Sequence, residues 1–404
     1  MNEQTRMQAT QILEKYSLCD ACLGRLFKKD IEKGSNEQKG RLLRKELHKS
    51  KKTPVTNCWL CEGLLDEIDH FTQLITDALN EYEYTTFLVG SKIDEDLKKR
   101  EQRLWDELGF TDAEPIKMEI NREVGKILEP RLGKTVDIPN PEIMAVIDTV
   151  FDVVHLQISP LFIYGRYKKL KRGIPQTKWP CQICRGKGCK RCNYSGKLYP
   201  TSVEELVADP ALEVTKGTDE SFHGSGREDI DALMLGTGRP FILEIKNPKI
   251  RTINLQLLEQ TINARTKDYI EVSSLRFSTR DEIARIKAAE FRKTYRVTIE
   301  ADQSLNKEKL IKVAQTLRGK LIKQLTPTRV AHRRANKIRE RTIYNCIIES
   351  VEGTRVTLMI ETESGTYVKE FVSGDDNKTQ PNLSELIGIP CTVKELDVID
   401  VKGE

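Results

Sequence analysis

The chain has 404 residues, of which 38% are hydrophobic and 31% are charged, and its formal net charge at pH 7 is +5. That length predicts two or three domains with enough apolar residues for their cores. No run approaches the roughly 18 consecutive apolar residues of a membrane helix, and the polar residues 1–4 do not resemble a secretory signal. We therefore expect a soluble cytoplasmic protein that does not enter a membrane.

Residues 1–70 are predicted to form a helical unit around a metal site. Cys19 and Cys22 form one Cys-x-x-Cys pair, and Cys58 and Cys61 form a second pair after a segment long enough for a helical insertion. Each two-residue gap lets one tight turn present both sulfurs to a cation, and two such pairs fill a tetrahedral site. A filled site is structural, and zinc is the expected metal. An iron–sulfur cluster and redox-active thiols are the alternatives.

Residues 71–165 are predicted to form a small α/β domain. The segment 84–90 is typical of a strand, the segments 94–108 and 120–132 are typical of helices, and a mostly apolar run covers 150–163. Alternating strands and helices of this kind predict a sheet with helices packed on it.

Residues 166–200 are predicted to be a basic linker with a second metal site. No Asp or Glu lies between Val153 and Val203, whereas eleven Lys and Arg lie between 166 and 197. Such a segment favours binding of phosphates, hence of a nucleic acid, although a solvated charged face is the alternative. The same segment carries two more Cys-x-x-Cys pairs, separated by glycines that permit a tight reversal, which predict a zinc knuckle formed by Cys181, Cys184, Cys189 and Cys192.

Residues 201–404 are predicted to form an α+β domain with long connections. Strand-like segments at 241–245, 295–299, 355–361 and 392–401 alternate with helical segments at 279–289 and 305–317. Within this region, residues 222–231 hold two glycines, an arginine and three carboxylates. A carboxylate on a rigid loop beside an arginine can serve as a nucleophile or a base. A dinucleotide site is disfavoured because no suitable helix follows the glycines.

The segment Gly226-Arg227-Glu228-Asp229 resembles the Gly-Arg-x-Asp signature of pseudouridine synthases. The resemblance extends over about 158–401, through Gly165-Arg166-Tyr167, Gly238-Arg239-Pro240-Phe241, Lys293-Thr294-Tyr295 and Gly365-Thr366-Tyr367-Val368-Lys369. It identifies one branch, the archaeal and eukaryotic tRNA pseudouridine synthases that act at T-loop positions 54 and 55. It implies a mixed, mainly antiparallel catalytic sheet with flanking helices, a zinc unit and a THUMP-like RNA-binding domain over 71–165. It also implies a tRNA partner and no organic cofactor. We expect a monomer.

The resemblance also implies residue roles. Asp229 matches the catalytic aspartate, and Arg227 matches the arginine that fills the gap left by the extruded base and pairs with that aspartate. Tyr295 matches the tyrosine that stacks on the target uracil. Lys369 matches the basic residue that follows the Gly-Thr-Tyr turn and pairs with the aspartate, and Tyr367 of that turn is also expected to bind the substrate. Leu396 matches an aliphatic residue that closes the pocket.

Each of these roles has an alternative. Asp231 lies on the same loop as Asp229, and only the register of the family motif favours Asp229. Arg227 could contact a phosphate instead, and Tyr295, in an alternating strand, could be a core residue. The chief alternative function is a non-catalytic RNA-binding protein, which would be expected to have lost Asp229, Tyr295 or Lys369. A THUMP-bearing methyltransferase or thiolase would need a cofactor or ATP loop, and neither pattern is present.

Overall fold

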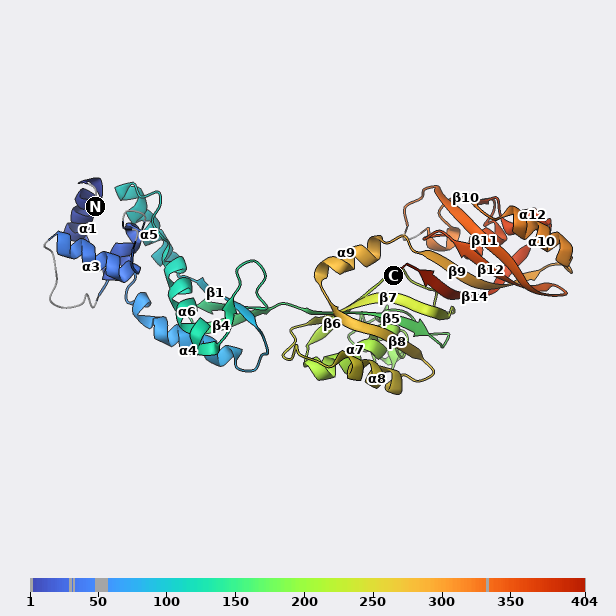
Figure 1. Cartoon of the computed structure of the whole chain (residues 1–404), viewed down its shortest axis with the longest axis horizontal. Helices are drawn as coiled ribbons and strands as arrows, with labels where there is room; N and C mark the ends of the chain where they lie inside the picture. The colour runs from blue at the N-terminus through green and yellow to red at the C-terminus, as the bar shows by residue number, and fades with distance from the viewer. Residues whose placement is uncertain (1–2, 29–30, 32, 48–56, 332–333, 404) are drawn as a thin grey trace. The chain divides into compact units, whose positions relative to one another are not determined.

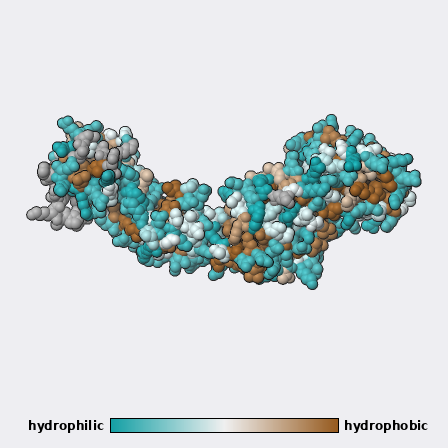
Figure 2. All heavy atoms as spheres, viewed as in Figure 1, coloured by the Kyte–Doolittle hydropathy of each residue, from teal (hydrophilic) through white to brown (hydrophobic). Residues whose placement is uncertain are grey.

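The computed structural model describes residues 3–28, 31, 33–47, 57–331 and 334–403 (Figure 1). The chain forms two compact units, one of Met1–Pro160 with Lys249–Arg251 and one of Leu161–Pro248 with Thr252–Glu404. Among the described residues no helix is long and apolar enough to cross a membrane. The face drawn in Figure 2 is mainly hydrophilic, with separate hydrophobic patches.

The N-terminal part of the first unit is helical. It contains α1 (Glu3–Lys15), α2 (Asp20–Leu26) and α3 (Asn36–Glu46). Ser35 starts α3 with a capping box, because its hydroxyl accepts from the Gln38 amide while the Gln38 side chain accepts from the Ser35 amide. Two glycines allow α2 and α3 to pack closely. A Cβ on Gly24 would lie 1.8 Å from the Asn36 carbonyl oxygen, so only glycine fits there.

The rest of the first unit is an α/β layer. Its helices are η1 (Leu64–Glu67), α4 (Ile68–Leu79), α5 (Glu95–Leu108) and α6 (Ile116–Leu132). Its sheet has the order β2-β1-β3-β4, formed by β1 (Thr86–Lys92), β2 (Thr135–Val136), β3 (Ile143–Asp148) and β4 (Val153–Ile158). β1 is parallel to β2 and β3, whereas β3 and β4 are antiparallel. One apolar core joins this layer to the helical part.

The second unit is built on a ten-stranded sheet of order β13-β10-β11-β12-β9-β14-β7-β5-β8, with β6 paired to β7. All pairings are antiparallel except the parallel contact of β14 with β7. The strands are β5 (Leu161–Lys169), β6 (Asp219–Gly224), β7 (Met234–Lys246), β8 (Ile270–Ser278), β9 (Arg292–Ala301), β10 (Lys320–Gln324), β11 (Arg339–Glu352), β12 (Arg355–Thr362), β13 (Thr379–Gln380) and β14 (Cys391–Lys402). The predicted α+β class with a mainly antiparallel sheet is confirmed.

Helices cover this sheet at both ends (Figure 1). α7 (Val203–Thr215) and α8 (Leu255–Arg265) pack on β5, β7 and β8 in one core. α10 (Lys307–Thr316), α11 (Val368–Ser373) and α12 (Leu383–Ile387) pack with β9, β11 and β12 in a second core. The remaining helices are η2 (Lys190–Cys192), α9 (Arg280–Ala288) and η3 (Thr328–Val330).

The division between the units differs from the boundary expected at residue 165. Residues 161–169 form β5, which pairs with β7 on one side and β8 on the other. Arg166 to Lys169 therefore lie inside the second unit's sheet rather than in a linker. The sequence does not predict that this strand is paired on both sides, because it contains several basic residues. Those side chains bind partners that are distant in sequence, which spacing does not reveal.

Candidate active site and metal centres

The loop that joins β6 to β7 carries the Gly-Arg-x-Asp motif, and its x residue forms a buried ion pair. Glu228 Oε2 lies 2.8 Å from Arg239 Nε, and both side chains are 1% exposed. The Tyr167 hydroxyl lies 2.8 and 2.9 Å from the two carboxylate oxygens of Glu228. Burial raises the pKa of Tyr167 well above its usual value. The hydroxyl therefore stays protonated and donates a hydrogen bond to Glu228. Gln176 Nε2 adds hydrogen bonds to Tyr167 Oη at 2.8 Å and to the Gly226 carbonyl at 3.0 Å.

Two basic side chains hold the backbone of the same loop. Lys169 is fully buried, and its Nζ donates to the carbonyls of Ile174, Asp229 and Ile230 at 2.9, 3.0 and 3.2 Å. Arg172 donates to the Asp231 carbonyl at 2.7 Å and forms a bidentate pair with Asp397 at 2.6 and 2.8 Å. The loop backbone is therefore fixed on both sides of the motif, which pre-organises the aspartate side chains.

The carboxylate of Asp229 faces two cations from other elements. Asp229 Oδ2 lies 3.1 Å from Lys369 Nζ and 3.8 Å from Arg329 Nη1. Lys369 lies in the first turn of α11, and Arg329 is itself held by Glu370 at 2.6 Å. Lys369 Nζ also lies 3.3 Å from Asp231 Oδ2. Asp229 is 37% exposed and Asp231 is 72% exposed. The more enclosed carboxylate, with two cationic neighbours, is Asp229.

Tyr295 and Leu396 lie on one face of the adjacent strands β9 and β14. Tyr295 is opposite Val398, and Leu396 is opposite Val297, so both side chains point to the same side of the sheet. The Val398 amide donates to the Leu233 carbonyl at 3.0 Å, which joins this strand pair to the end of the loop between β6 and β7. Burial raises the pKa of Tyr295 to about 12, and the negative charge of Asp229 also raises it.

The structure also places Tyr367 beside this group. Tyr367 is the residue immediately before α11, and Gln324 holds its backbone through hydrogen bonds of 2.9 and 3.0 Å to its amide and carbonyl. The Arg339 guanidinium carbon lies 5.9 Å from the centre of the Tyr367 ring. Gln324 therefore fixes the backbone at the start of α11, two residues before Lys369.

Arg227 departs from the expected arrangement. Its guanidinium carbon lies 4.9 Å from the centre of the Trp179 ring, and it forms no ion pair with Asp229 in this structure. Among the described residues the expected ion pair of Arg227 with the aspartate is not formed, whereas Lys369 and Arg329 are two cations that lie near that carboxylate.

Several residues that hold the site were not assigned by the sequence analysis. Glu228, Arg239, Tyr167 and Lys169 lie within or next to motifs that the resemblance uses, but nothing in their spacing indicates that they meet. Lys293 is a further example. It is 9% exposed, and burial lowers its pKa to about 8. In the sequence, only its position two residues before Tyr295 indicates that Lys293 lies near the site.

The first cysteine group fits a tetrahedral metal ion. The sulfurs of Cys19, Cys22, Cys58 and Cys61 all lie within 4.8 Å of one another, and the sulfurs of Cys19 and Cys61 are 3.8 Å apart. A zinc–sulfur distance of about 2.3 Å gives tetrahedral sulfur–sulfur distances of roughly 3.8 Å. The buried Arg25 lies 3.8 Å from the Cys22 sulfur and favours its thiolate form. These residues could therefore hold zinc.

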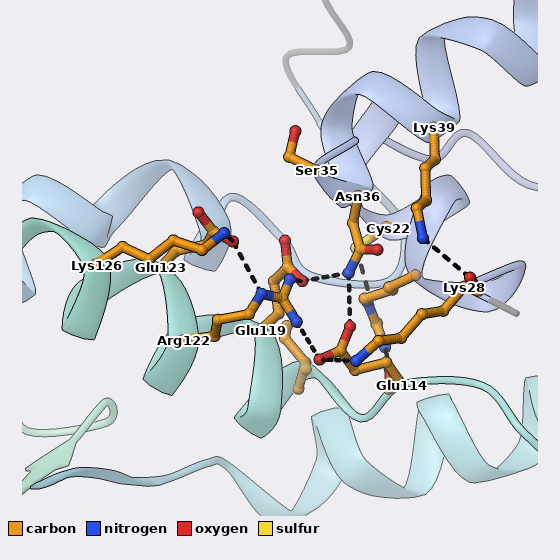
Figure 3. A network of polar contacts seen from close by, with 12 residues as sticks. Cys22, Lys28, Ser35, Asn36, Lys39, Glu114, Glu119, Arg122, Glu123 and Lys126 are labelled. Atoms are coloured by element: carbon orange, nitrogen blue, oxygen red, sulfur yellow. Dashed lines mark hydrogen bonds and ion pairs between the residues drawn. The ribbon is translucent and has the colours of Figure 1, made fainter. Parts of the chain in front are cut away.

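A buried polar network fixes this metal unit to α6 (Figure 3). Glu114 accepts from Lys28 at 2.9 Å and from Asn36 at 2.7 Å, and it also pairs with Arg122. Asn36 and Arg122 both bind Glu119 as well. Lys28, in the connection from α2 to α3, and Asn36 of α3 therefore contact carboxylates of α6 and of the segment before it. The helical unit and the α/β layer are thus joined by polar contacts as well as by the apolar core.

The second cysteine group has the same geometry. The sulfurs of Cys181 and Cys189 are 4.0 Å apart, those of Cys184 and Cys192 are 3.8 Å apart, and those of Cys189 and Cys192 are 3.7 Å apart. Gly196 has a φ of +70°, and a Cβ there would lie 2.3 Å from the Gly186 carbonyl oxygen. Only glycine permits this closure. We call residues 181–196 the knuckle, and its four sulfurs could also hold zinc.

The basic segment 166–197 is less available to phosphate than its composition suggests. Six of its eleven cations are bound by carbonyls or by acids from distant parts of the chain: Arg166, Lys168, Lys169, Arg172, Lys178 and Lys197. Four others lie exposed on the knuckle: Arg185, Lys187, Lys190 and Arg191. The expectation of one continuous phosphate-binding stripe is corrected to a smaller basic surface on the knuckle. The sequence also holds a second basic cluster that is expected to contact phosphate, formed by His332, Arg333 and Arg334 with Arg329, Lys337, Arg339 and Arg341. Of these residues, His332 and Arg333 lie outside the described part of the chain.

Comparisons with known proteins agree with this architecture. The family model described as "Pus10, C-terminal" matches residues 162–402, and that described as "Pus10 THUMP domain, archaeal" matches residues 71–148. A protein of Methanothermobacter marburgensis named tRNA pseudouridine synthase Pus10 is 41% identical, over 99% of this chain and 99% of its own length. The protein of that name from Methanocaldococcus jannaschii is also 41% identical, over 97% of this chain and 93% of its own. A solved Cbf5–Nop10–Gar1 complex aligns at 14% identity and a TM-score of 0.32, over 59% of this chain and 48% of that one, which is too weak to support an argument.

Proposed function

The chain belongs to the Pus10 family of tRNA pseudouridine synthases, and we propose that it isomerises uridine to pseudouridine in the T-loop of tRNA, at position 54, position 55 or both. Membership confirms the resemblance inferred from the sequence and the enzyme class, an isomerase that modifies tRNA. The observation that carries the proposal for this site is the contact of Lys369 with Asp229 on a loop whose backbone is held by buried partners.

The reaction breaks the bond between C1′ of ribose and N1 of uracil and forms a bond between C1′ and C5. The proton on C5 is removed and N1 gains a proton, so neither a redox step nor a group donor is needed. Asp229 is the proposed catalytic residue, acting either as the nucleophile or as the base. Lys369 and Arg329 favour its ionised form, which both roles require.

The target uridine is stacked in a folded T-loop, so the base must be extruded before it reacts. Tyr295 is placed to stack on the extruded uracil, since stacking needs only an aromatic face. Leu396 lies on the same side of the sheet as Tyr295 and is proposed to close the uracil pocket beside it. Arg227 enters the space that the base leaves. Tyr367, the residue immediately before α11, is proposed to contact the substrate beside Lys369.

The two cysteine groups are proposed to hold structural zinc, one ion each. All four ligands of each site are protein sulfurs, so zinc would supply folding stability rather than an open position for chemistry. Cys19, Cys22, Cys58 and Cys61 would stabilise the helical unit, and the second group would stabilise the knuckle. The cytoplasmic location and the monomeric state stay predictions from the sequence.

The proposal is tested with three unmodified tRNA transcripts: the natural sequence, one with cytidine in place of uridine 54 and one with cytidine in place of uridine 55. After incubation with the purified chain, pseudouridine is mapped at single-nucleotide resolution. We expect pseudouridine at 54, 55 or both, and its loss only at the replaced position. Pseudouridine confined to another arm of the tRNA would contradict the T-loop assignment. Binding of tRNA without any pseudouridine would favour the non-catalytic alternative.

A further inference from the structure

The side chain of Arg227 contacts the aromatic ring of Trp179, next to the knuckle. The guanidinium carbon lies 4.9 Å from the centre of the Trp179 ring, within the range of a favourable cation–π contact. Arg227 is exposed, and within the described part of the chain it has no hydrogen bond or ion pair with an acidic side chain. Trp179 is therefore the side chain that determines where this guanidinium lies.

Trp179 is itself held in place. The Leu198 amide donates to the Trp179 carbonyl at 2.8 Å, and the Cys181 amide donates to the Gly196 carbonyl at 2.7 Å. These bonds make residues 179–181 and 196–198 the paired root of the knuckle. The Tyr199 ring packs edge-on against Trp179, with the ring centres 5.6 Å apart. The indole therefore lies at the root of the knuckle and packs against a ring of the same root.

The root is also fixed to the catalytic unit by ion pairs on both of its strands. Lys178 pairs with Glu220 of β6, and its amide donates to Glu204 of α7 at 2.7 Å. Lys197 pairs with Glu205 of α7. The root is thus bound to β6, and the loop with Arg227 directly follows β6 in the chain. Arg227 on the loop and Trp179 on the root thus meet at a defined position.

We propose that Trp179 is a positioning residue for base extrusion: its ring, fixed by the knuckle, holds the Arg227 guanidinium beside the catalytic loop, ready to enter the space that the uridine leaves. This inference rests on the proposed function of Arg227. A free arginine side chain loses more rotamer freedom on entering the helical stack than one already ordered against a ring. Trp179 therefore affects the step in which the base leaves, and the knuckle acts on catalysis through Trp179.

The contact is tested first by substitution at Trp179. The single-turnover rate at saturating tRNA should fall about threefold to tenfold in W179L, which loses the ring, and less in W179F, which keeps one. The dissociation constant of tRNA should stay the same in both variants. A knuckle variant at an exposed side chain, Ile183→Ala, should keep the wild-type rate. A W179L rate equal to that of the wild type would overturn the proposal.

A double-mutant cycle separates positioning from a general effect on the fold. If Trp179 acts through Arg227, then W179L should cause no further loss of rate in an R227A background. An equal loss in both backgrounds would overturn the proposal, because it would show that Trp179 acts independently of Arg227. The bound metal in each variant should equal that of the wild type, which reports on the integrity of the knuckle.

A readout that does not depend on activity tests the contact itself. The chain has three tryptophans, and the signal of Trp179 is obtained as the fluorescence difference between the chain and W179F. Quenching of that signal by acrylamide should increase in R227A, because the guanidinium no longer covers the ring. Unchanged quenching would overturn the proposed contact. A wild-type chain that formed no pseudouridine would contradict the proposed function, whereas an unaltered W179L rate beside an inactive D229N variant would contradict only the role of Trp179.

Discussion

Lys369 Nζ lies 3.1 Å from Asp229 Oδ2 and 3.3 Å from Asp231 Oδ2. One lysine of α11 therefore faces both aspartates of the loop that joins β6 to β7, although the two elements are far apart in sequence. Lys169 and Arg172 hold the backbone of that loop, so the aspartates are presented to the lysine from a fixed backbone. The geometry is set by the fold.

Replacing Lys369 with methionine should lower the single-turnover rate by about tenfold to a hundredfold, the effect of removing a charge-assisted hydrogen bond. Lys369→Arg should restore part of the loss, because it keeps the charge but not the shape of the ammonium group. Rapid-quench measurement of pseudouridine at saturating tRNA gives both rates. Equal rates for the methionine variant and the wild type would show that the ion pair is not used in the reaction.

The buried pair of Glu228 and Arg239 should matter for stability. Glu228→Gln removes one charge and leaves the buried Arg239 unpaired, which should lower the free energy of unfolding by about 3 to 5 kcal/mol. The matched control is Asp219→Asn, which breaks the exposed pair with Lys246 and should cost about 1 kcal/mol or less. Denaturant titrations of the full chain measure both. Similar small losses in the two variants would contradict a stabilising role for the buried pair.

The buried Lys293 should make stability depend on pH. Burial lowers its pKa from 10.5 to about 8, so between these values the unfolded chain binds a proton that the folded chain does not. Stability from this group therefore rises as the pH rises through that window, by up to about 3 kcal/mol. Lys293→Met should remove this rise, as measured by denaturant unfolding at pH 7 and pH 10. The same pH dependence in the variant and the wild type would contradict the assignment.

The basic surface of the knuckle should bind tRNA phosphates. Replacing Arg185, Lys187, Lys190 and Arg191 with alanine should weaken tRNA binding and reduce the slope of log K against log salt by about 0.7 to 0.9 for each lost contact. A matched control replaces four exposed cations elsewhere in the unit: Lys307, Lys309, Lys312 and Arg318. Lys169 and Arg172 are kept, because their loss would disturb the catalytic loop. An unchanged slope in the knuckle variant would show that these cations face only solvent.

The sequence predicts features that depend on local spacing. The Cys-x-x-Cys pairs identify both sulfur groups that the structure brings together. The alternating residues 295–299 identify the middle of β9, and the strand-like segment 392–401 identifies nearly all of β14. Contacts between distant segments are not visible in spacing. The acids that pair with Lys178, Lys197 and Arg172 come from β6, α7 and β14. The absence of acids within the segment therefore does not mean that its cations are available to bind phosphate. Similarly, the meeting of Glu228 with Arg239 depends on how the loop folds back on β7.

The central claim is that Asp229 performs the chemistry, and a comparison of D229N with D231N tests it most directly. Asn and Asp are nearly isosteric, so both variants should fold and bind tRNA, but an amide is neither a base nor a nucleophile. Pseudouridine is mapped in the T-loop after a single turnover at saturating tRNA. D229N should form none, a loss of about 10³-fold or more, while D231N should stay within about tenfold of the wild type, since Asp231 shares only Lys369. Near-normal pseudouridine formation by D229N, with D231N inactive, would contradict the claim and assign the reaction to Asp231.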